Sequence, residues 1–126
     1  MITTVHLKRD PDCYRVDRAT ALGNPFDLAS EAQRTAVIRA HKEYLWLMVS
    51  RGLEPVAAAE QVGRKHGLPI SPKWRRPSRA AFMAALSKAR CAERLGCWCA
   101  PKPCHADNYV AYFEYLEREN ERAKAN

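Results

Sequence analysis

LGCWCAPKPCHAD, at residues 95–107, is the stretch that decides the fold of this chain. Its apolar lead-in, Leu95 to Trp98, predicts a short buried strand, and the residues after Asp107 predict a helix. Three of the five cysteines and one of the four histidines therefore lie on a strand-to-helix turn. In an α/β domain such a turn can bind an anion with its backbone N–H groups, lower the pKa of a thiol or hold a metal ion.

The segments before and after this turn alternate between strand and helix. Apolar spacing predicts a strand at 94–99, further strands at 2–8 and 14–16, and helices at about 30–50, 54–65 and 105–122, with another helix capped by Ser78. Leu68 to Ile70 is where an additional strand would fit. This order predicts an α/β fold: a small Rossmann-like domain with few, mostly parallel strands flanked by helices.

The length of 126 residues predicts a single α/β domain spanning 1–126, with an irregular basic loop at about 68–77 that holds three prolines. Apolar content of 47% with 28% charged residues argues against wholesale disorder. No apolar run would span a membrane, and Met1 to Asp10 lacks the apolar core of a signal peptide. Together with the odd number of cysteines, this leads us to expect a cytoplasmic protein with free or metal-bound thiols.

The net charge of +7 is concentrated between residues 64 and 94, where nine basic residues face the single acid Glu93. Such a patch suits nucleic acid or an acidic protein surface, while a solvated face that maintains solubility is the alternative. Basic side chains around an aromatic ring can hold phosphates while a base stacks. The candidate patch consists of Lys73, Trp74, Arg75, Arg76 and Arg79.

The cysteine turn offers a candidate metal site. Cys97, Cys99, Cys104 and His105 supply three sulfurs and one imidazole, which is a ligand set that zinc accepts, and Cys97 and Cys99 share a face of the expected strand. Structural zinc sites usually combine two short knuckles separated by a longer loop, whereas here all four ligands lie on one turn. We therefore expect no cofactor, and zinc is the alternative.

The same turn can instead bind an organic ligand. Parallel strands end at one edge of a sheet, so the loop around Asn24 should meet the cysteine turn there. Arg18 can fork onto a phosphate or carboxylate, Asn24 can donate and accept, and His105 can act together with the first N–H groups of the last helix. Cys99 and Cys104 would shape the pocket, and Arg34 would support it.

Plainer interpretations of the same residues stay open at this point. Asn24 can cap its own backbone beside a surface arginine, and cysteines are often small buried apolar residues. Cys104 near a helix N-terminus with His105 next to it also has the composition of a nucleophile with its base, although neighbours on a turn seldom point at one another.

Three separated motifs resemble a known family. VDR at 16–18 with LGNPF at 22–26, RTAVI at 34–38 and the turn at 95–107 are similar to the domain of unknown function 4326, found in phages and bacteria. The resemblance implies a Rossmann-like domain in a phage or prophage setting. Asp17 stands where the family usually has glycine, and the stretch from about 55 to 78 is longer than usual. A second group is similar only at a C-x-E-x4-C-H turn, which puts a glutamate at Cys99 and speaks against a four-ligand zinc site.

These observations lead to one main functional hypothesis. We expect a phage-type small domain that binds a nucleotide-like or phosphorylated ligand at the strand-end edge and either processes or sequesters it in the host cell. The alternatives are a zinc-stabilised nucleic-acid-binding module and an inhibitor of a host protein that acts through the basic patch. The sequence leaves the reaction, if there is one, and the oligomeric state open.

Overall fold

The computed structural model describes residues 2–125 and shows an α/β fold with a small parallel sheet and four helices. The elements follow the predicted order closely. They are β1 (Thr3–His6), β2 (Tyr14–Arg15), the 3-10 turn η1 (Glu31–Gln33), α1 (Arg34–Arg51), α2 (Pro55–His66), α3 (Arg79–Arg90), β3 (Arg94–Cys97) and α4 (Ala106–Ala125).

The sheet has the order β1-β3-β2, and both pairs of neighbours are parallel. Thr3 lies opposite Arg94, and Tyr14 lies opposite Leu95, so the last strand in the chain is the central one. All three strands therefore end at the same edge. The prediction of few, mostly parallel strands is confirmed.

A glycine in the central strand lets the β1–β2 connection close over the sheet. A Cβ atom on Gly96 would lie 2.7 Å from a methyl group of Leu7 and would also collide with the sulfur of Cys13. Because only a hydrogen fits there, the chain after β1 can fold back across the sheet and bring the loop that follows β2 to the carboxyl edge.

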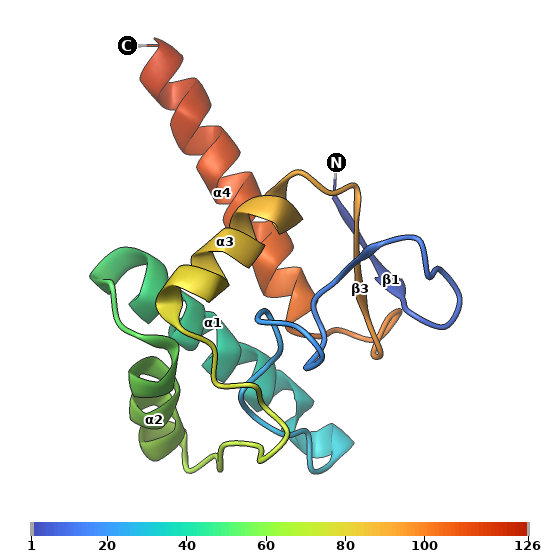
Figure 1. Cartoon of the computed structure of the whole chain (residues 1–126), viewed down its shortest axis with the longest axis vertical. Coiled ribbons are helices and arrows are strands. Elements are labelled where there is room, and N and C mark those ends of the chain that lie inside the picture. The colour runs from blue at the N-terminus through green and yellow to red at the C-terminus, as the bar shows by residue number, and fades with distance from the viewer. Residues whose placement is uncertain (1, 126) are drawn as a thin grey trace.

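The helices lie beside the small sheet rather than on both of its faces (Figure 1). The helix α4 packs against β1 and β3 and contacts α1, which in turn packs against α2. Figure 1 also shows that the C-terminal part of α4 extends beyond the other elements. Within residues 2–125, no helix combines the length and the apolarity that crossing a membrane requires.

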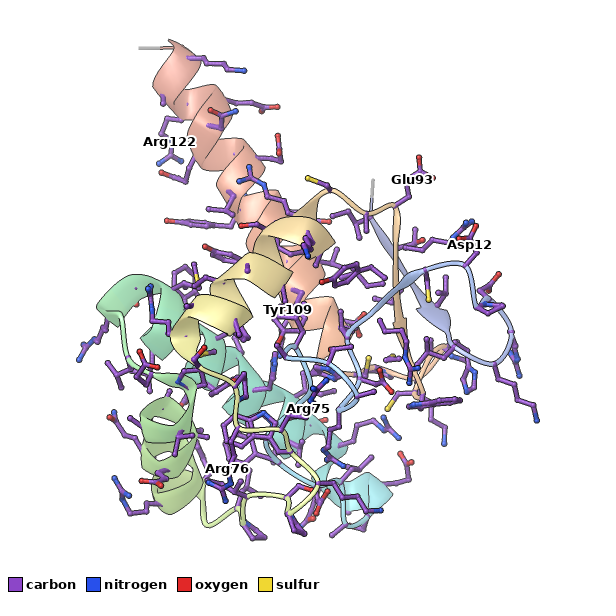
Figure 2. The ribbon with its side chains drawn as sticks, viewed as in Figure 1. Asp12, Arg75, Arg76, Glu93, Tyr109 and Arg122 are labelled. Carbon is purple, nitrogen blue, oxygen red and sulfur yellow. The ribbon has the colours of Figure 1, made fainter. Side chains whose placement is uncertain are left out.

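One hydrophobic cluster connects all four helices with the sheet. Tyr44, Phe82 and Tyr109 are aromatic members of this cluster, and each is fully buried. Figure 2 shows Tyr109 on α4 at the centre of the molecule. The core therefore holds α4 directly behind the cysteine turn, at which this helix begins.

Local signals set several helix ends. The Ser78 hydroxyl accepts a hydrogen bond from Ala81 N at 3.1 Å, as expected for a cap, and Gly52 and Gly67 end their helices in the left-handed conformation. The first long helix begins at Arg34 rather than Ser30, because residues 31–33 form a tighter 3-10 turn.

Two sequence predictions about strands need correction. The additional strand expected at 68–70 is a single antiparallel bridge between Phe26 and Ile70, because the prolines around it leave no room for a ladder. The strand expected to reach Cys99 ends at Cys97. Cys99 therefore lies in the turn, and its relation to Cys97 comes from the turn and not from a shared strand face.

Candidate functional site

A cavity of about 520 Å³ lies at the carboxyl edge of the sheet. Its lining comes from the loop after β2, from the start of α1 and from the cysteine turn. All six residues that the sequence singled out for a ligand line it, namely Arg18, Asn24, Arg34, Cys99, Cys104 and His105. The remaining lining residues are Asp17, Phe26, Asp27, Leu28, Ala29, Val37, Ile38, Cys97 and Trp98.

Arg18 holds the loop that forms one wall of the cavity. Its Nε donates to the carbonyl of Asn24 and its Nη2 to that of Phe26, each at 3.0 Å, and Nη2 also pairs with Asp27 at 2.8 Å. Asn24 Oδ1 accepts a hydrogen bond from the Phe26 N–H at 3.0 Å. The side-chain oxygen of Asn24 therefore caps the backbone of its own loop, which is one of the two interpretations that the sequence left open. Arg18 has a structural role in addition to facing the cavity.

Arg34 joins the start of α1 to the cysteine turn. It forms a two-pronged pair with Glu31, at 2.7 and 2.8 Å, and its Nη1 donates to the carbonyl of Pro103 at 2.8 Å. The hydrogen bonds from Arg34 lower the pKa of Glu31 to about 2. Because Glu31 fixes the guanidinium, Arg34 presents a positive charge in a fixed position at the wall of the cavity that Cys99 also lines.

Three thiols converge at the floor of the cavity. Cys97 Sγ and Cys104 Sγ are 2.8 Å apart, and Cys99 lines the same cavity. Hydrogen bonds from Cys104 and Cys97, together with Arg34, hold the pKa of Cys99 far below its ordinary value despite partial burial. Hydrogen bonding to its two neighbours and burial raise the pKa of Cys104. These shifts favour the charged form of Cys99 over that of Cys104.

The N-terminus of α4 is already satisfied by its own residues. Cys104 Sγ accepts from Ala106 N at 3.4 Å, and Asp107 Oδ2 accepts from the N–H of Cys104 at 3.1 Å. The N–H groups of Asp107 and Asn108 donate to the carbonyls of Cys104 and His105. A phosphate at this helix end would have to displace these partners, so its binding there stays a prediction.

His105 is a structural residue of the cavity wall. Its Nε2 lies 2.6 Å from the carbonyl oxygen of Val16, so this nitrogen carries the proton and donates. The ring is 9% exposed, and burial lowers the pKa of His105. The Nε2–H bond ties α4 to the end of β2 and leaves this nitrogen unable to act as a base for Cys104.

A second buried histidine lies directly behind the first. His41 and His105 have ring centroids 5.0 Å apart. The Tyr109 hydroxyl donates to the carbonyl of Leu22 at 2.9 Å, so it accepts from His41 Nε2 at 3.1 Å. The other ring nitrogen of His41 accepts from Asn108 Nδ2 at 3.0 Å. Both histidines are thus neutral members of a hydrogen-bonded support under the cavity.

The alternative zinc set is not assembled. Within residues 2–125, no three His, Cys, Asp or Glu side chains are arranged to share one metal ion. His105 points its Nε2 at a carbonyl, and sulfurs around zinc would lie roughly 3.8 Å apart given Zn–S bonds of about 2.3 Å. The separation of 2.8 Å between Cys97 and Cys104 does not fit that spacing.

Sequence reasoning missed two residues of the site, Asp17 and Trp98. Trp98 is 57% exposed and donates from its indole N–H to Asp17 Oδ2 at 2.9 Å, and Arg15 also pairs with this carboxylate at 2.7 Å. Although burial raises it, these hydrogen bonds lower the pKa of Asp17 overall. An arginine two residues before an aspartate, next to a short strand, is the signal that could have indicated the pair of Arg15 with Asp17.

The candidate basic patch is largely anchored to the fold. Trp74 is 3% exposed, so the expectation that it stacks on a base is wrong, since the core covers its ring. Arg75 donates to the carbonyl of Ala19, and Arg79 donates to that of Met48 at 3.1 Å. The Arg76 guanidinium lies 5.9 Å from the centre of the Trp74 ring. Figure 2 shows Arg75 and Arg76 on the loop between α2 and α3.

Lys73 is exposed, and its backbone N–H donates to the Ser71 hydroxyl. Among residues 2–125, its ammonium group has no hydrogen-bond or ion-pair partner. A partner for the basic segment stays a prediction.

A family model described as "Domain of unknown function (DUF4326)" matches residues 3–115. No curated protein and no solved structure matches the chain.

Proposed function

The chain belongs to this family of domains of unknown function, and we propose that it binds a small nucleotide-like or otherwise phosphorylated ligand in the cavity at the carboxyl edge of its sheet. The observation that supports this most is the cavity itself. Two loops that are far apart in sequence, at 17–29 and 97–105, face each other across it. Open α/β sheets bind their ligands at this edge, and the volume of about 520 Å³ lies within the usual range for small-molecule sites.

The cavity has an apolar wall that suits a flat ring. Phe26, Leu28, Val37 and Ile38 line it from the loop and from the first turns of α1. Trp98 stands at its edge with much of its indole exposed. A few polar groups opposite an apolar wall are the usual composition of a site for a heterocyclic ligand.

Arg18 is the best place for the anionic group of the ligand. Its side chain is 31% exposed, and its partner Asp27 is 46% exposed. A solvent-exposed ion pair contributes only about 0–1 kcal/mol, so a phosphate can replace Asp27 at little cost. The two bonds from Arg18 to backbone carbonyls would keep the guanidinium in place during this exchange. Arg34 would instead stay with Glu31 and orient the turn.

The motif resemblance supports a phage or prophage setting, in the cytoplasm of a bacterial host. The ligand would then be a nucleotide of the infected cell, which the domain either sequesters or processes.

The test is a thermal-shift and calorimetric titration with adenosine and guanosine mono-, di- and triphosphates and with ribose 5-phosphate. We expect at least one of them to raise the melting temperature, because a ligand at 100 times its Kd stabilises the folded state by about 2.7 kcal/mol. Ala29→Trp should abolish this shift, because Ala29 is an exposed residue at the cavity wall and the larger side chain would fill the entrance.

Ala57→Trp is the matched control, since Ala57 is equally exposed but lies on α2 outside the cavity. Asp27→Asn should strengthen binding, because it releases the Arg18 guanidinium without breaking its backbone bonds. Equal binding by the two tryptophan variants, or no shift with any compound of the panel, would show that the cavity does not take this class of ligand.

A further inference from the structure

We propose that Cys97, Cys99 and Cys104 form a thiol–disulfide exchange site, in which Cys99 attacks a small anionic disulfide and Cys104 resolves the product. This activity goes beyond the proposed ligand binding. It uses the same cavity as an entrance but does not depend on a phosphorylated ligand.

The three thiols of the cluster differ in how far they are buried. Cys97 is 2% exposed at the end of β3 and Cys104 is 4% exposed at the start of α4, whereas Cys99 is only partly buried on the turn between them. All three line the cavity. A substrate that enters the cavity can therefore reach the sulfur of Cys99 first. The two buried thiols line the same cavity, and their sulfurs are 2.8 Å apart.

The surroundings of Cys99 favour its charged form. Arg34 lines the same cavity, and Glu31 and the carbonyl of Pro103 hold its guanidinium in place. Cys104 and Cys97 also lower the pKa of Cys99. Because the thiolate is the nucleophile in disulfide exchange, this arrangement prepares Cys99 for attack while Cys104 keeps its proton.

The exchange takes two steps. In the first, the Cys99 thiolate attacks one sulfur of the substrate R–S–S–R, the S–S bond breaks and its electron pair leaves with the other sulfur as RS⁻. The Cys99 sulfur is then part of a neutral mixed disulfide. It therefore no longer attracts the proton of the Cys104 thiol. In the second, Cys104 passes this proton to RS⁻, attacks the Cys99 sulfur and displaces the second RS⁻. Two protein thiols are oxidised, and one disulfide is reduced to two thiols.

Charge selects the substrate class. Arg18 faces the cavity with part of its side chain exposed, and its partner Asp27 is exchangeable. A disulfide that carries carboxylates can pair with Arg18 while its sulfur approaches Cys99. Oxidised glutathione is the suitable probe, and the neutral hydroxyethyl disulfide is the matched comparison.

The experiment incubates the reduced full-length protein with oxidised glutathione in mildly acidic buffer and follows the reaction by intact mass and peptide mapping. We expect the wild type to lose two hydrogen atoms through a Cys99–Cys104 disulfide and to release two glutathione molecules. Cys104→Ser should stop at one glutathione bound to Cys99. Serine is favoured at helix N-caps, so this variant keeps the acceptor for the N–H of Ala106.

The controls separate the cluster from ordinary thiols. Cys99→Ser should abolish the fast reaction, whereas Cys91→Ser should react like the wild type, because Cys91 is an exposed cysteine after α3 and outside the cavity. The proposal would be overturned by a Cys99→Ser variant that reacts as fast as the wild type, or by glutathione mapped to Cys91 or Cys13. A native mass showing one zinc per chain would also overturn it.

Two arms of the experiment distinguish this activity from nucleotide binding. Oxidised glutathione should react at least several times faster than hydroxyethyl disulfide, and equal rates would overturn the assignment of an anionic substrate. If the reaction proceeds although no phosphorylated compound binds, the proposed function fails and the exchange site stands. If a phosphorylated compound binds but no exchange occurs, the exchange site is overturned and the proposed function stands.

Discussion

Single side chains at this cavity do two kinds of work, and the structure separates them. Arg18, Asn24 and His105 face the cavity, yet each has its main hydrogen bonds with the backbone of the loop after β2. Cys99 has no such task, and it is a partly buried thiol beside a held arginine. A substitution at one of the first three would therefore change the loop as well as any ligand contact. Cys99 is the residue whose replacement reports on chemistry.

The first prediction concerns Gly23, in the loop that Arg18 holds. A Cβ atom at this position would lie 2.5 Å from the Cα of Arg18. Gly23→Ala should therefore lower the free energy of unfolding by about 2 kcal/mol, because backbone rather than a flexible side chain must move. Urea denaturation measures this change.

Gly52→Ala is the comparison for the first prediction. Gly52 has a φ of 72°, but a Cβ atom at this position would have no other atom within 4 Å. This substitution should therefore cost about 1 kcal/mol through the backbone conformation alone. A smaller loss for Gly23→Ala than for Gly52→Ala would mean that the close approach does not stabilise the loop.

At the scale of elements, the cysteine turn works because rigid pieces flank it on both sides. The strand β3 is central in the sheet, and α4 is anchored by Tyr109 in the core. The turn between them is tied to α1 by the bond from Arg34 to Pro103 and to β2 by the bond from His105 to Val16. The convergence of three thiols follows from these four supports.

The second prediction concerns the cap of α3. Ser78→Ala should lower the free energy of unfolding by about 1 kcal/mol, because the N–H of Ala81 loses its acceptor. Ser87→Ala, on the exposed side of the same helix, should leave stability equal or slightly higher, because alanine is the better helix former. Thermal unfolding of the two variants is the measurement, and equal losses would contradict the role of the cap.

At the scale of the whole molecule, a buried polar network runs under the cavity through His41, His105, Asn108 and Tyr109. The network joins α1, α4 and the loop after β2. Each of its hydrogen bonds has one donor and one acceptor when both imidazoles are neutral. The network therefore couples the protonation of two histidines to the stability of the entire fold.

The third prediction is a loss of stability in mild acid. Burial lowers the pKa of both His41 and His105, whereas the unfolded chain has ordinary values near 6.5. Below that pH the unfolded state binds more protons than the folded state, so the contribution is complete above about pH 6.5 and is lost as the pH falls. The loss should approach about 1.4 kcal/mol per histidine for each pH unit.

Urea titrations at about pH 7.5 and about pH 5.5 measure the third prediction, in a window above the ordinary pKa of carboxyl groups. His41→Gln should remove about half of the pH dependence. Equal stability at the two pH values would show that the network tolerates a charged imidazole.

The sequence by itself determined what depends on neighbours along the chain. Apolar spacing, the Ser78 cap and the glycine stops specified the helices, and the lead-in at Leu95 specified the central strand, because these features act through local backbone geometry. The meeting of the loop around Asn24 with the cysteine turn was also predictable, because parallel strands end at one edge.

Only the tertiary structure decided which partner each polar group takes. His105 bonds to Val16 and Tyr109 bonds to Leu22, pairs that are 89 and 87 residues apart, and no local pattern specifies such a partner. The burial of Trp74, the pair of Asp17 with Trp98 and the 2.8 Å approach of two sulfurs have the same origin. Buried polar and aromatic groups are placed by packing among distant segments, and packing exists only once the chain has folded.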